Sequence, residues 1–202
     1  MSSITYILKK HFSKYFIVYI LFGLVSWVIG DWIFESKIAP KEEERIGVFV
    51  VGEDVTDDVF KDAILSSNPK ILEASCYSYS PSESTIRLKF TTEGRSLSDI
   101  YILPYENDSF PVEKLVLEQS CLPLEGDIQS FLEEVIASPS FISFDGYQYA
   151  VKLGDFSSKR LGDCLKKNDF EYCLLINNSS VNFGEKSTYG LDVLRYLLED
   201  KS

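Results

Sequence analysis

Residues 46–77 read IGVFVVGEDVTDDVFKDAILSSNPKILEASCY and contain the pattern that decides the fold class. The unbroken apolar run over residues 46–52 is typical of a strand buried on both faces. A helix follows, with Thr56 suited to its N-cap and Pro69 just after its end. Residues 71–77 are a second strand candidate. A strand, a helix and a strand in this order predict a βαβ unit and therefore an α/β fold.

The following segments extend this pattern. DIYILP, residues 99–104, predicts a third strand, and its parallel pairing with the first requires a crossover. Residues 83–92 are therefore favoured as a helix, although TIRLKF within them also alternates like an exposed strand. Asp145-Gly146 lies between two β-rich runs and predicts a type I′ hairpin over residues 141–153. The other predicted elements are helices over 112–118, 128–137, 161–167 and 191–198, and a strand over 172–177. This order predicts a three-layer α/β sandwich with a mostly parallel sheet.

Residues 15–34, YFIVYILFGLVSWVIGDWIF, are almost uniformly apolar and carry one charge, Asp31. A helix of this length spans about 30 Å, the thickness of the hydrocarbon core of a bilayer. Aromatic rings that suit the membrane interface lie towards its ends. We therefore expect a transmembrane helix rather than a buried core helix. Residues 35–45 are then a charged linker to a domain over 46–202.

The flanking charges predict an orientation. Three basic residues precede the apolar segment and three follow it, so their number alone is a tie. Lys9, Lys10 and Lys14 lie closer to the edge of the segment, with no acidic residue among them, which favours a cytoplasmic segment over residues 1–14. A cleaved signal peptide would have an apolar run of about 7–15 residues and a small-x-small site. The run here is longer, and Lys37 stands where a small residue belongs. We expect an uncleaved single-pass anchor in the cell membrane and an extracytoplasmic domain.

Charge and histidine content exclude several function classes. The chain of 202 residues has a net charge of −11. Residues 1–40 are net positive, so residues 41–202 have a net charge of −13. Such an acidic domain is unsuited to nucleic acid. The single histidine, His11, lies in the predicted cytoplasmic segment, so the domain lacks a histidine base, a Ser-His-Asp triad and His-ligated zinc. Phosphate-binding and dinucleotide-binding glycine motifs are also absent from the sequence. We expect no enzyme activity, cofactor or metal site.

Four cysteines follow the predicted anchor, and none has CxxC spacing: Cys76, Cys121, Cys164 and Cys173. In an oxidising compartment they allow up to two disulfides, and Cys164 with Cys173 is the pair nearest in sequence. Two of the four lie inside predicted strands, where a free buried thiol is common. Both alternatives are open at this stage.

Two short motifs carry a resemblance to a known family. SDIYILP at 98–104 resembles a strand that closes a βαβ unit, and DGYQYAVKL at 145–153 resembles a hairpin leading towards a hinge. With them, residues 46–155 resemble one lobe of an extracellular solute-binding protein of ABC importers. The whole chain is similar to small single-pass membrane proteins of bacteria that carry such a lobe. The resemblance implies a binding module accessory to an ABC-type transporter or another envelope complex.

A second lobe has no room in this sequence, because 49 residues follow Leu153. The alternative function is therefore a structural subunit that assembles a membrane protein complex without binding a ligand. Either function implies membrane lipid as a partner through residues 15–34, together with a membrane protein partner.

A ligand site in a parallel sheet lies beyond the carboxyl ends of its strands. Glu53 follows the first predicted strand, and Tyr105 and Glu106 follow DIYILP. Tyr147 and Tyr149 on the hairpin are further candidates, although two tyrosines on one strand face also suit simple packing. Aromatic rings beside acids would suit a sugar or a cationic solute.

Overall fold

The computed structural model describes residues 3–37, 39–105, 111–165, 171–184 and 187–200, and within the first helix the side chains of residues 15, 16 and 18–34. The chain divides into two compact units, Met1–Pro40 and Lys41–Ser202. The boundary falls inside the predicted charged linker. Of that linker, residues Glu42–Glu44 form a 3₁₀ turn, η1.

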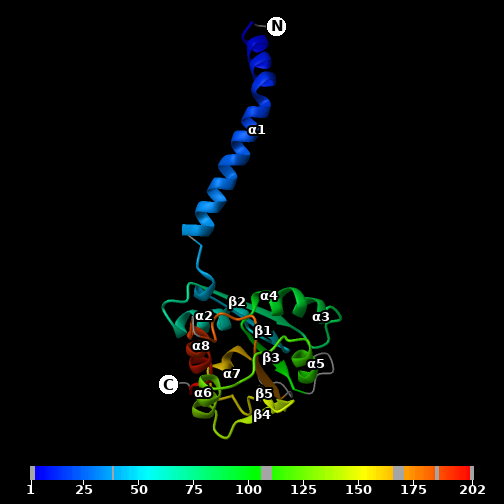
Figure 1. The fold of residues 1–202 in the computed structure, drawn as a ribbon, viewed down its shortest axis with the longest axis vertical. Helices are drawn as coiled ribbons and strands as arrows, with labels where there is room; N and C mark the ends of the chain where they lie inside the picture. Colours follow the sequence, from blue (N-terminus) through cyan, green and yellow to red (C-terminus); the bar gives the residue numbers. More distant parts are fainter. Residues whose placement is uncertain (1–2, 38, 106–110, 166–170, 185–186, 201–202) are drawn as a thin grey trace. The chain divides into compact units, whose positions relative to one another are not determined.

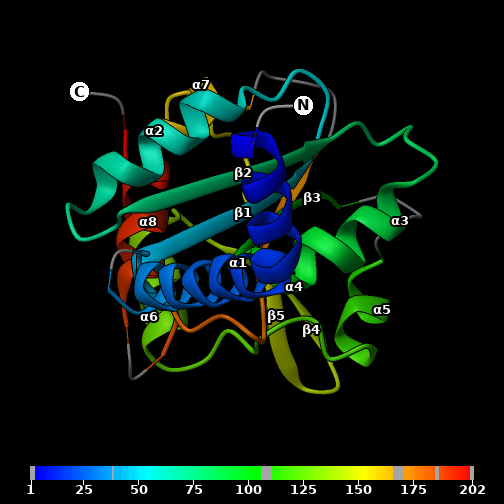
Figure 2. The same cartoon turned by 90° about the horizontal axis from the view of Figure 1, so that it is seen from above.

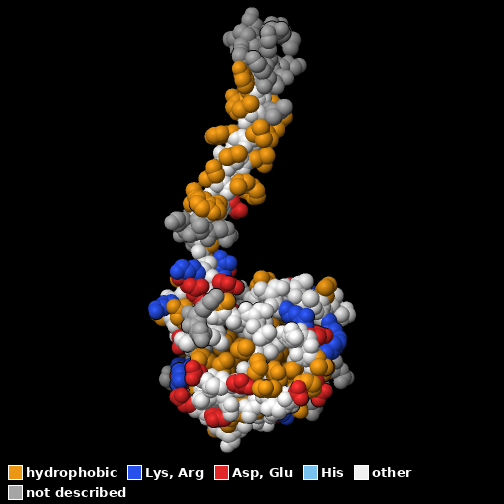
Figure 3. All heavy atoms as spheres, viewed as in Figure 1, with side chains coloured by type: hydrophobic (Ala, Val, Ile, Leu, Met, Phe, Trp, Pro, Cys, Tyr) orange, Lys and Arg blue, Asp and Glu red, His pale blue; other side chains and the backbone are white. Residues whose placement is uncertain are grey.

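The first unit is one continuous helix, α1, over Ser3–Lys37 (Figure 1). It contains the predicted segment 15–34 and extends beyond it at both ends. Every described side chain of α1 is exposed, including fifteen large apolar ones between Tyr15 and Phe34 (Figure 3). Within the described residues, no helix has the length and the apolar character that crossing a membrane requires. The predicted helix over residues 15–34 is confirmed, whereas its insertion into a membrane stays a prediction.

The second unit is built on a six-stranded sheet in the order β2-β1-β3-β6-β5-β4 (Figure 2). The strands are β1 (Arg45–Val51), β2 (Glu73–Tyr79), β3 (Ile100–Pro104), β4 (Ser140–Phe144), β5 (Tyr147–Lys152) and β6 (Tyr172–Ile176). β1 pairs in parallel with β2 and β3. The other three pairings, β3 with β6, β6 with β5 and β5 with β4, are antiparallel.

The α/β class is confirmed, but the prediction of a mostly parallel sheet is wrong because the sheet is mixed. Each strand is predicted from its own residues, and the composition of a buried strand such as β6 does not show whether it runs parallel or antiparallel to its neighbours. Direction depends instead on the neighbour. β6 enters the sheet between β3 and β5 and is antiparallel to both.

Helices cover both faces of this sheet (Figure 1). They are α2 (Asp57–Ser67), α3 (Ile86–Lys89), α4 (Arg95–Leu97), α5 (Val112–Leu117), α6 (Asp127–Val135), α7 (Leu161–Cys164) and α8 (Tyr189–Leu198), and a π turn, η2 (Phe90–Gly94), joins α3 to α4. The helix favoured over residues 83–92 is confirmed from Ile86 onward. α7 is shorter than the predicted helix over 161–167, and residues 166 and 167 lie outside the described part.

The two faces carry separate apolar cores. The α8-side core contains Val48 and Val50 of β1 and is covered by α2, α6, α7 and α8. The α5-side core contains Phe49 and Val51 and is covered by α3, η2 and α5. β1 therefore buries alternate side chains on opposite faces, as its unbroken apolar run predicts.

The predicted hairpin is confirmed by its turn. Asp145 has φ 51° and Gly146 has φ 86°. A type I′ turn needs positive φ at both central residues, and its twist matches that of the flanking strands β4 and β5.

Candidate functional site

The residues predicted to bind a ligand do not form one site. Lys152 at the end of β5 pairs with Cys173, and Pro104 at the end of β3 pairs with Tyr172. The end of β5 therefore lies at the carboxyl edge of β3, whereas Tyr147 begins β5 at the opposite edge. Tyr149 packs against the α5-side core. The expectation that both tyrosines lie beside the strand-end residues is wrong. β5 runs in the same direction as β3, because both are antiparallel to β6, so the first residues of β5 lie at the opposite edge of the sheet.

At the carboxyl edge, the structure places Tyr105 in a local cluster. The ammonium of Lys152 lies 3.7 Å from the centroid of the Tyr105 ring and 2.9 Å from Oε2 of Glu171. The lysine therefore covers one face of the Tyr105 ring. Glu53 is exposed at the end of β1. Glu106 lies outside the described residues.

A hollow lies instead at the opposite edge, where β1 and β3 begin. We name it the Asp99 hollow. Its volume is about 280 Å³. Its walls come from the starts of β1, β2 and β3, from α4 and from the loop after β6. The lining residues are Glu42, Arg45, Ile46, Gly47, Glu73, Ser75, Tyr77, Arg95, Ser96, Leu97, Ser98, Asp99, Asn177, Ser179, Ser180 and Val181.

Asp99 joins three segments of chain at this hollow. Its carboxylate accepts hydrogen bonds from the backbone N–H of Gly47 at 2.9 Å, from Nδ2 of Asn182 at 3.1 Å and from the Ser180 hydroxyl. Burial raises the pKa of Asp99, and the charge of Glu42 adds to the rise, while these three hydrogen bonds act in the opposite direction. Asp99 therefore fixes the loop after β6 to the start of β1.

The backbone at Leu97 approaches position 47 so closely that only glycine fits there. A Cβ at this position would lie 2.0 Å from the carbonyl oxygen of Leu97. The chain is held there because the N–H of Asp99 donates to the Gly47 carbonyl at 2.7 Å. Only a residue without a side chain lets α4 end directly above β1.

The two arginines of the hollow are both paired. Nε of Arg45 lies 3.3 Å from Oε2 of Glu73, and Nη2 of Arg95 donates to Glu118. Asn177 holds the backbone here, since its Nδ2 donates to the carbonyls of Arg95 at 3.0 Å and Ser98 at 2.6 Å. The Nε of Arg95 is buried and has no hydrogen-bond partner among the described residues. The guanidinium carbon lies 5.9 Å from the centroid of the Phe90 ring, which belongs to the α5-side core.

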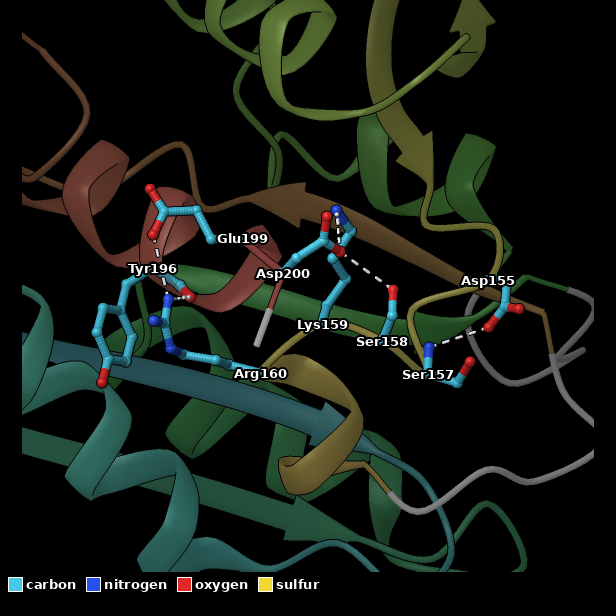
Figure 4. Close-up of polar contacts among 8 residues, drawn as sticks. All are labelled: Asp155, Ser157, Ser158, Lys159, Arg160, Tyr196, Glu199 and Asp200. Atoms are coloured by element: carbon cyan, nitrogen blue, oxygen red, sulfur yellow. Dashed lines mark hydrogen bonds and ion pairs between the residues drawn. The ribbon is translucent and has the colours of Figure 1, made fainter. Parts of the chain in front are cut away.

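A second polar cluster joins the loop after β5 to the end of α8 (Figure 4). Lys159 Nζ lies 2.9 Å from Oδ1 of Asp200, to which the Ser158 hydroxyl donates at 3.1 Å. Arg160 Nη1 donates to Oε2 of Glu199 at 3.1 Å, and its guanidinium lies 4.2 Å from the centroid of the Tyr196 ring. The groups drawn are paired with one another at a helix C-terminus, where cations are favourable. This cluster acts as a structural link.

The four cysteines, all of them described, are buried, and none forms a disulfide. Of the two alternatives left open by the sequence, the structure has the reduced thiols: Cys164 lies in the α8-side core and Cys173 in the α5-side core, so they do not pair. Nearness in sequence is misleading here, since the sheet lies between the two cores. Burial raises the pKa of Cys121 and of Cys173 to about 12. These thiols therefore stay protonated near neutral pH.

Residues 41–202 contain no histidine, and in the described part of the chain no group of three His, Cys, Asp or Glu side chains is placed to hold a metal ion. No family model, curated protein or solved structure matches this chain.

Sequence reasoning missed Asp99, Arg95 and the asparagines after β6. Their signals were present, since Asp99 directly precedes a buried strand and NNSSVN at 177–182 directly follows another. The search was confined to the carboxyl ends of strands, because ligand sites of parallel sheets lie there. In a mixed sheet the end of β6 lies at the start of β3, so polar residues from both sides meet at the other edge.

Proposed function

We propose that this chain is a membrane-anchored binding module. Residues 15–34 would hold it in a bilayer, and the domain over 46–202 would bind a small polar solute in the Asp99 hollow. The observation that carries the binding role is the hollow itself, about 280 Å³ in volume, where the exposed residues Ser96 and Ser179 lie beside Asp99.

Lipid is the proposed partner of α1. Its described side chains are exposed, and large apolar ones occur in every turn from Tyr15 to Phe34. Water is a poor solvent for such a surface, and a helical segment of 20 residues with one charge, Asp31, has the length of a hydrocarbon core of about 30 Å. We expect the full-length chain to stay in the membrane fraction after alkaline carbonate extraction. A double variant, Leu24→Arg with Val25→Arg, should release it, because each central arginine opposes insertion by about 2.5–3.5 kcal/mol. Release of the unmodified chain would contradict the anchor.

The orientation has a separate test. The lysines at positions 9, 10 and 14 favour a cytoplasmic amino terminus and an extracytoplasmic domain. The four natural cysteines are buried, so they give little background with a membrane-impermeant thiol reagent. Lys10→Cys should stay unlabelled in intact cells, whereas Ser143→Cys, at an exposed position of β4, should be labelled. Labelling at position 10 from outside would reverse the proposed topology.

The likeness to one lobe of a solute-binding protein belongs to the same proposal. It is supported by the parallel arrangement of β2, β1 and β3, in which α2 connects β1 to β2. In that role the module would act beside an ABC-type transporter or another envelope complex.

A thermal-shift screen of the full-length chain tests solute binding. It should contain sugars, amino acids, short peptides and polyamines. A ligand present at about 100 times its Kd stabilises the folded state by about 2.7 kcal/mol, which corresponds to a clear rise in Tm. A Ser179→Trp variant, which places a large ring at an exposed lining position of the hollow, should lose the response. A screen in which no compound shifts the Tm would remove the binding role.

The second candidate function is an assembly subunit that binds no solute. It is favoured by β4, an edge strand with the uncharged sequence SFISF. Exposed edges are usually protected by charges, because unpaired backbone groups can pair with another strand. A photo-crosslinker at Ser143 should then capture a membrane protein partner, and a crosslinker at exposed Leu72 in the loop before β2 should not. Equal capture at both positions would argue against a β4 interface.

A further inference from the structure

Each of the two apolar cores contains two buried cysteines. Cys76 and Cys164 belong to the α8-side core, and Cys121 and Cys173 belong to the α5-side core. The structure describes all four as thiols, which is the reduced form. A disulfide joins residues whose α carbons are about 4.4–6.8 Å apart. The packing around each pair therefore decides which of them can be joined.

The start of α2 connects the surroundings of Cys76 and Cys164. The N–H of Thr56 donates to the carbonyl of Cys164 at 3.0 Å, and a β-bridge joins the residues on either side of this contact. The next residue, Asp57, is the first of α2, and its side chain is within hydrogen-bonding reach of the Cys76 thiol. Residues 56 and 57 therefore contact both cysteines, one through the backbone and the other through a side chain.

The two cysteines of the α5-side core are separated along β6. Cys121 lies opposite Asn177 in an isolated antiparallel bridge, and Cys173 is four residues earlier in the same extended segment. Four residues of a strand span about 13 Å, which is too long for a disulfide. The thiol of Cys173 donates instead to the carbonyl of Leu103, at 3.4 Å.

The surroundings of Cys76 also determine when a bond can form. Burial raises the pKa of the Cys76 thiol, Asp57 and the nearby Cys164 raise it further, and Lys61 acts in the opposite direction. The species that attacks in disulfide formation is a thiolate. Because this thiolate is scarce in the folded domain, the bond has to form before α2 and α7 close over β2.

We propose that Cys76 and Cys164 form a disulfide when the domain folds in an oxidising environment, and that Cys121 and Cys173 stay thiols. The two thiols lose two protons and two electrons, and their sulfurs form one S–S bond. A small disulfide of the glutathione type takes up these protons and electrons and becomes two thiols. In the cell this step depends on the extracytoplasmic location proposed above, since thiols stay reduced in the cytosol.

The bond would fix an edge of the sheet. β2 is an edge strand whose single neighbour is β1, and Cys76 lies in its middle. α2 packs against both β2 and α7, the helix that ends at Cys164. The two cysteines are 88 positions apart, and a bond that closes so long a loop constrains the unfolded chain strongly. We therefore expect the oxidised chain to be the more stable form.

The test starts from the full-length chain in detergent, reduced and unfolded in urea. Dilution into a mixture of reduced and oxidised glutathione should give a chain lighter by two hydrogen atoms. Peptide mapping without reduction should find the peptides of Cys76 and Cys164 linked. After a second unfolding, a thiol reagent should label only Cys121 and Cys173, whereas a chain refolded without oxidant should be labelled at all four cysteines. The Tm of the oxidised chain should be higher by about 5–15 °C.

Matched variants identify the pair. Cys76→Ala should abolish the bond and the difference in Tm between the oxidised and reduced chains. Cys121→Ala removes a buried cysteine of the other core and should keep both. Circular dichroism of the reduced variants establishes that they are folded, and Cys164→Ala provides the same test from the other side of the pair.

The outcomes separate this inference from the proposed function. A chain that regains its native circular dichroism spectrum with four reduced thiols would overturn the inference, and so would a bond between Cys121 and Cys173. The refolding test does not depend on the location of the domain or on a ligand. A bond that forms on refolding but is missing from the chain isolated from cells would contradict formation in the cell and the extracytoplasmic location, and would leave the pairing intact.

Discussion

Two tyrosines of the α5-side core should respond in opposite directions when their hydroxyl groups are removed. The ring of Tyr101 is 0% exposed and packs edge-on against Phe90 at a centroid distance of 5.0 Å. Its hydroxyl is buried and has no hydrogen-bond partner among the described residues. Burial raises the pKa of Tyr101 well above its ordinary value, so the hydroxyl stays protonated. A buried polar group without a partner costs about 1–3 kcal/mol. Tyr101→Phe keeps the ring and should therefore stabilise the domain by about 1–2 kcal/mol.

Tyr79→Phe is the matched control. Tyr79 lies on β2 and contacts the same cluster through Phe49, with ring centroids 5.5 Å apart. Its hydroxyl donates to the carboxylate of Glu93, and the ammonium of Lys89 lies 4.9 Å from its ring centroid. Removal of this hydroxyl loses a hydrogen bond to a charged group. Because the residue is half-buried, the domain should be destabilised by about 1 kcal/mol.

The assay is urea unfolding of both variants and of the unmodified chain, followed by circular dichroism. At equal m-values, a higher midpoint for Tyr101→Phe and a lower one for Tyr79→Phe are expected. In thermal unfolding, 1 kcal/mol corresponds to about 2–4 °C for a domain of 150–250 residues. If Tyr101→Phe lowers the free energy of unfolding by about 1 kcal/mol, the hydroxyl has a partner and the reasoning is wrong.

Three further predictions concern the edge of the Asp99 hollow and the buried thiols. Gly47→Ala should destabilise the domain by about 1–3 kcal/mol, because the new Cβ meets Leu97 O; an unchanged unfolding midpoint would mean that α4 moves freely. The pKa of Asp99 is raised in the folded state, so the folded state binds this proton more tightly than the unfolded state does. The free energy of unfolding, compared with that of Asp99→Asn, should therefore fall as the pH rises from the ordinary pKa of 3.8 through the folded pKa. A free energy of unfolding that rises over this pH range would contradict the raised pKa. Cys121 and Cys173, whose pKa values are raised to about 12, should react with a thiol reagent only after urea unfolding, and rapid labelling of the native chain would contradict their burial.

Local patterns predicted most of the elements correctly, since each depends on neighbouring residues. The Asp145-Gly146 turn needs only two positive φ angles, and the α2 region needs one apolar face ended by Pro69. Where a terminus depends on distant packing, the predictions shifted by one or two residues. β2 begins at Glu73 instead of residue 71, and α6 begins at Asp127, with Gly126 in the capping position.

Strand direction and the site could not be read in the same way. β6 takes its place between β3 and β5 through long-range pairings, such as Lys152 with Cys173, 21 positions apart, and Leu103 with Cys173, 70 positions apart. The hollow depends on the same long-range pairing, because Asp99 meets Ser180 only once β6 is beside β3. A single sequence shows that polar residues flank each of these strands, but it does not show which of them meet.

The central position of β6 has a consequence for biosynthesis. During translation, the parallel half of the sheet and the β4–β5 hairpin both emerge from the ribosome before residues 172–176. Until then, β3 and β5 each present an unpaired edge, and the α5-side core lacks Cys173 and Leu175. Unpaired strand edges readily join other chains. The nascent chain is therefore most vulnerable to aggregation in the interval before β6 appears, and a synonymous codon change that slows elongation between residues 153 and 172 should lengthen that interval.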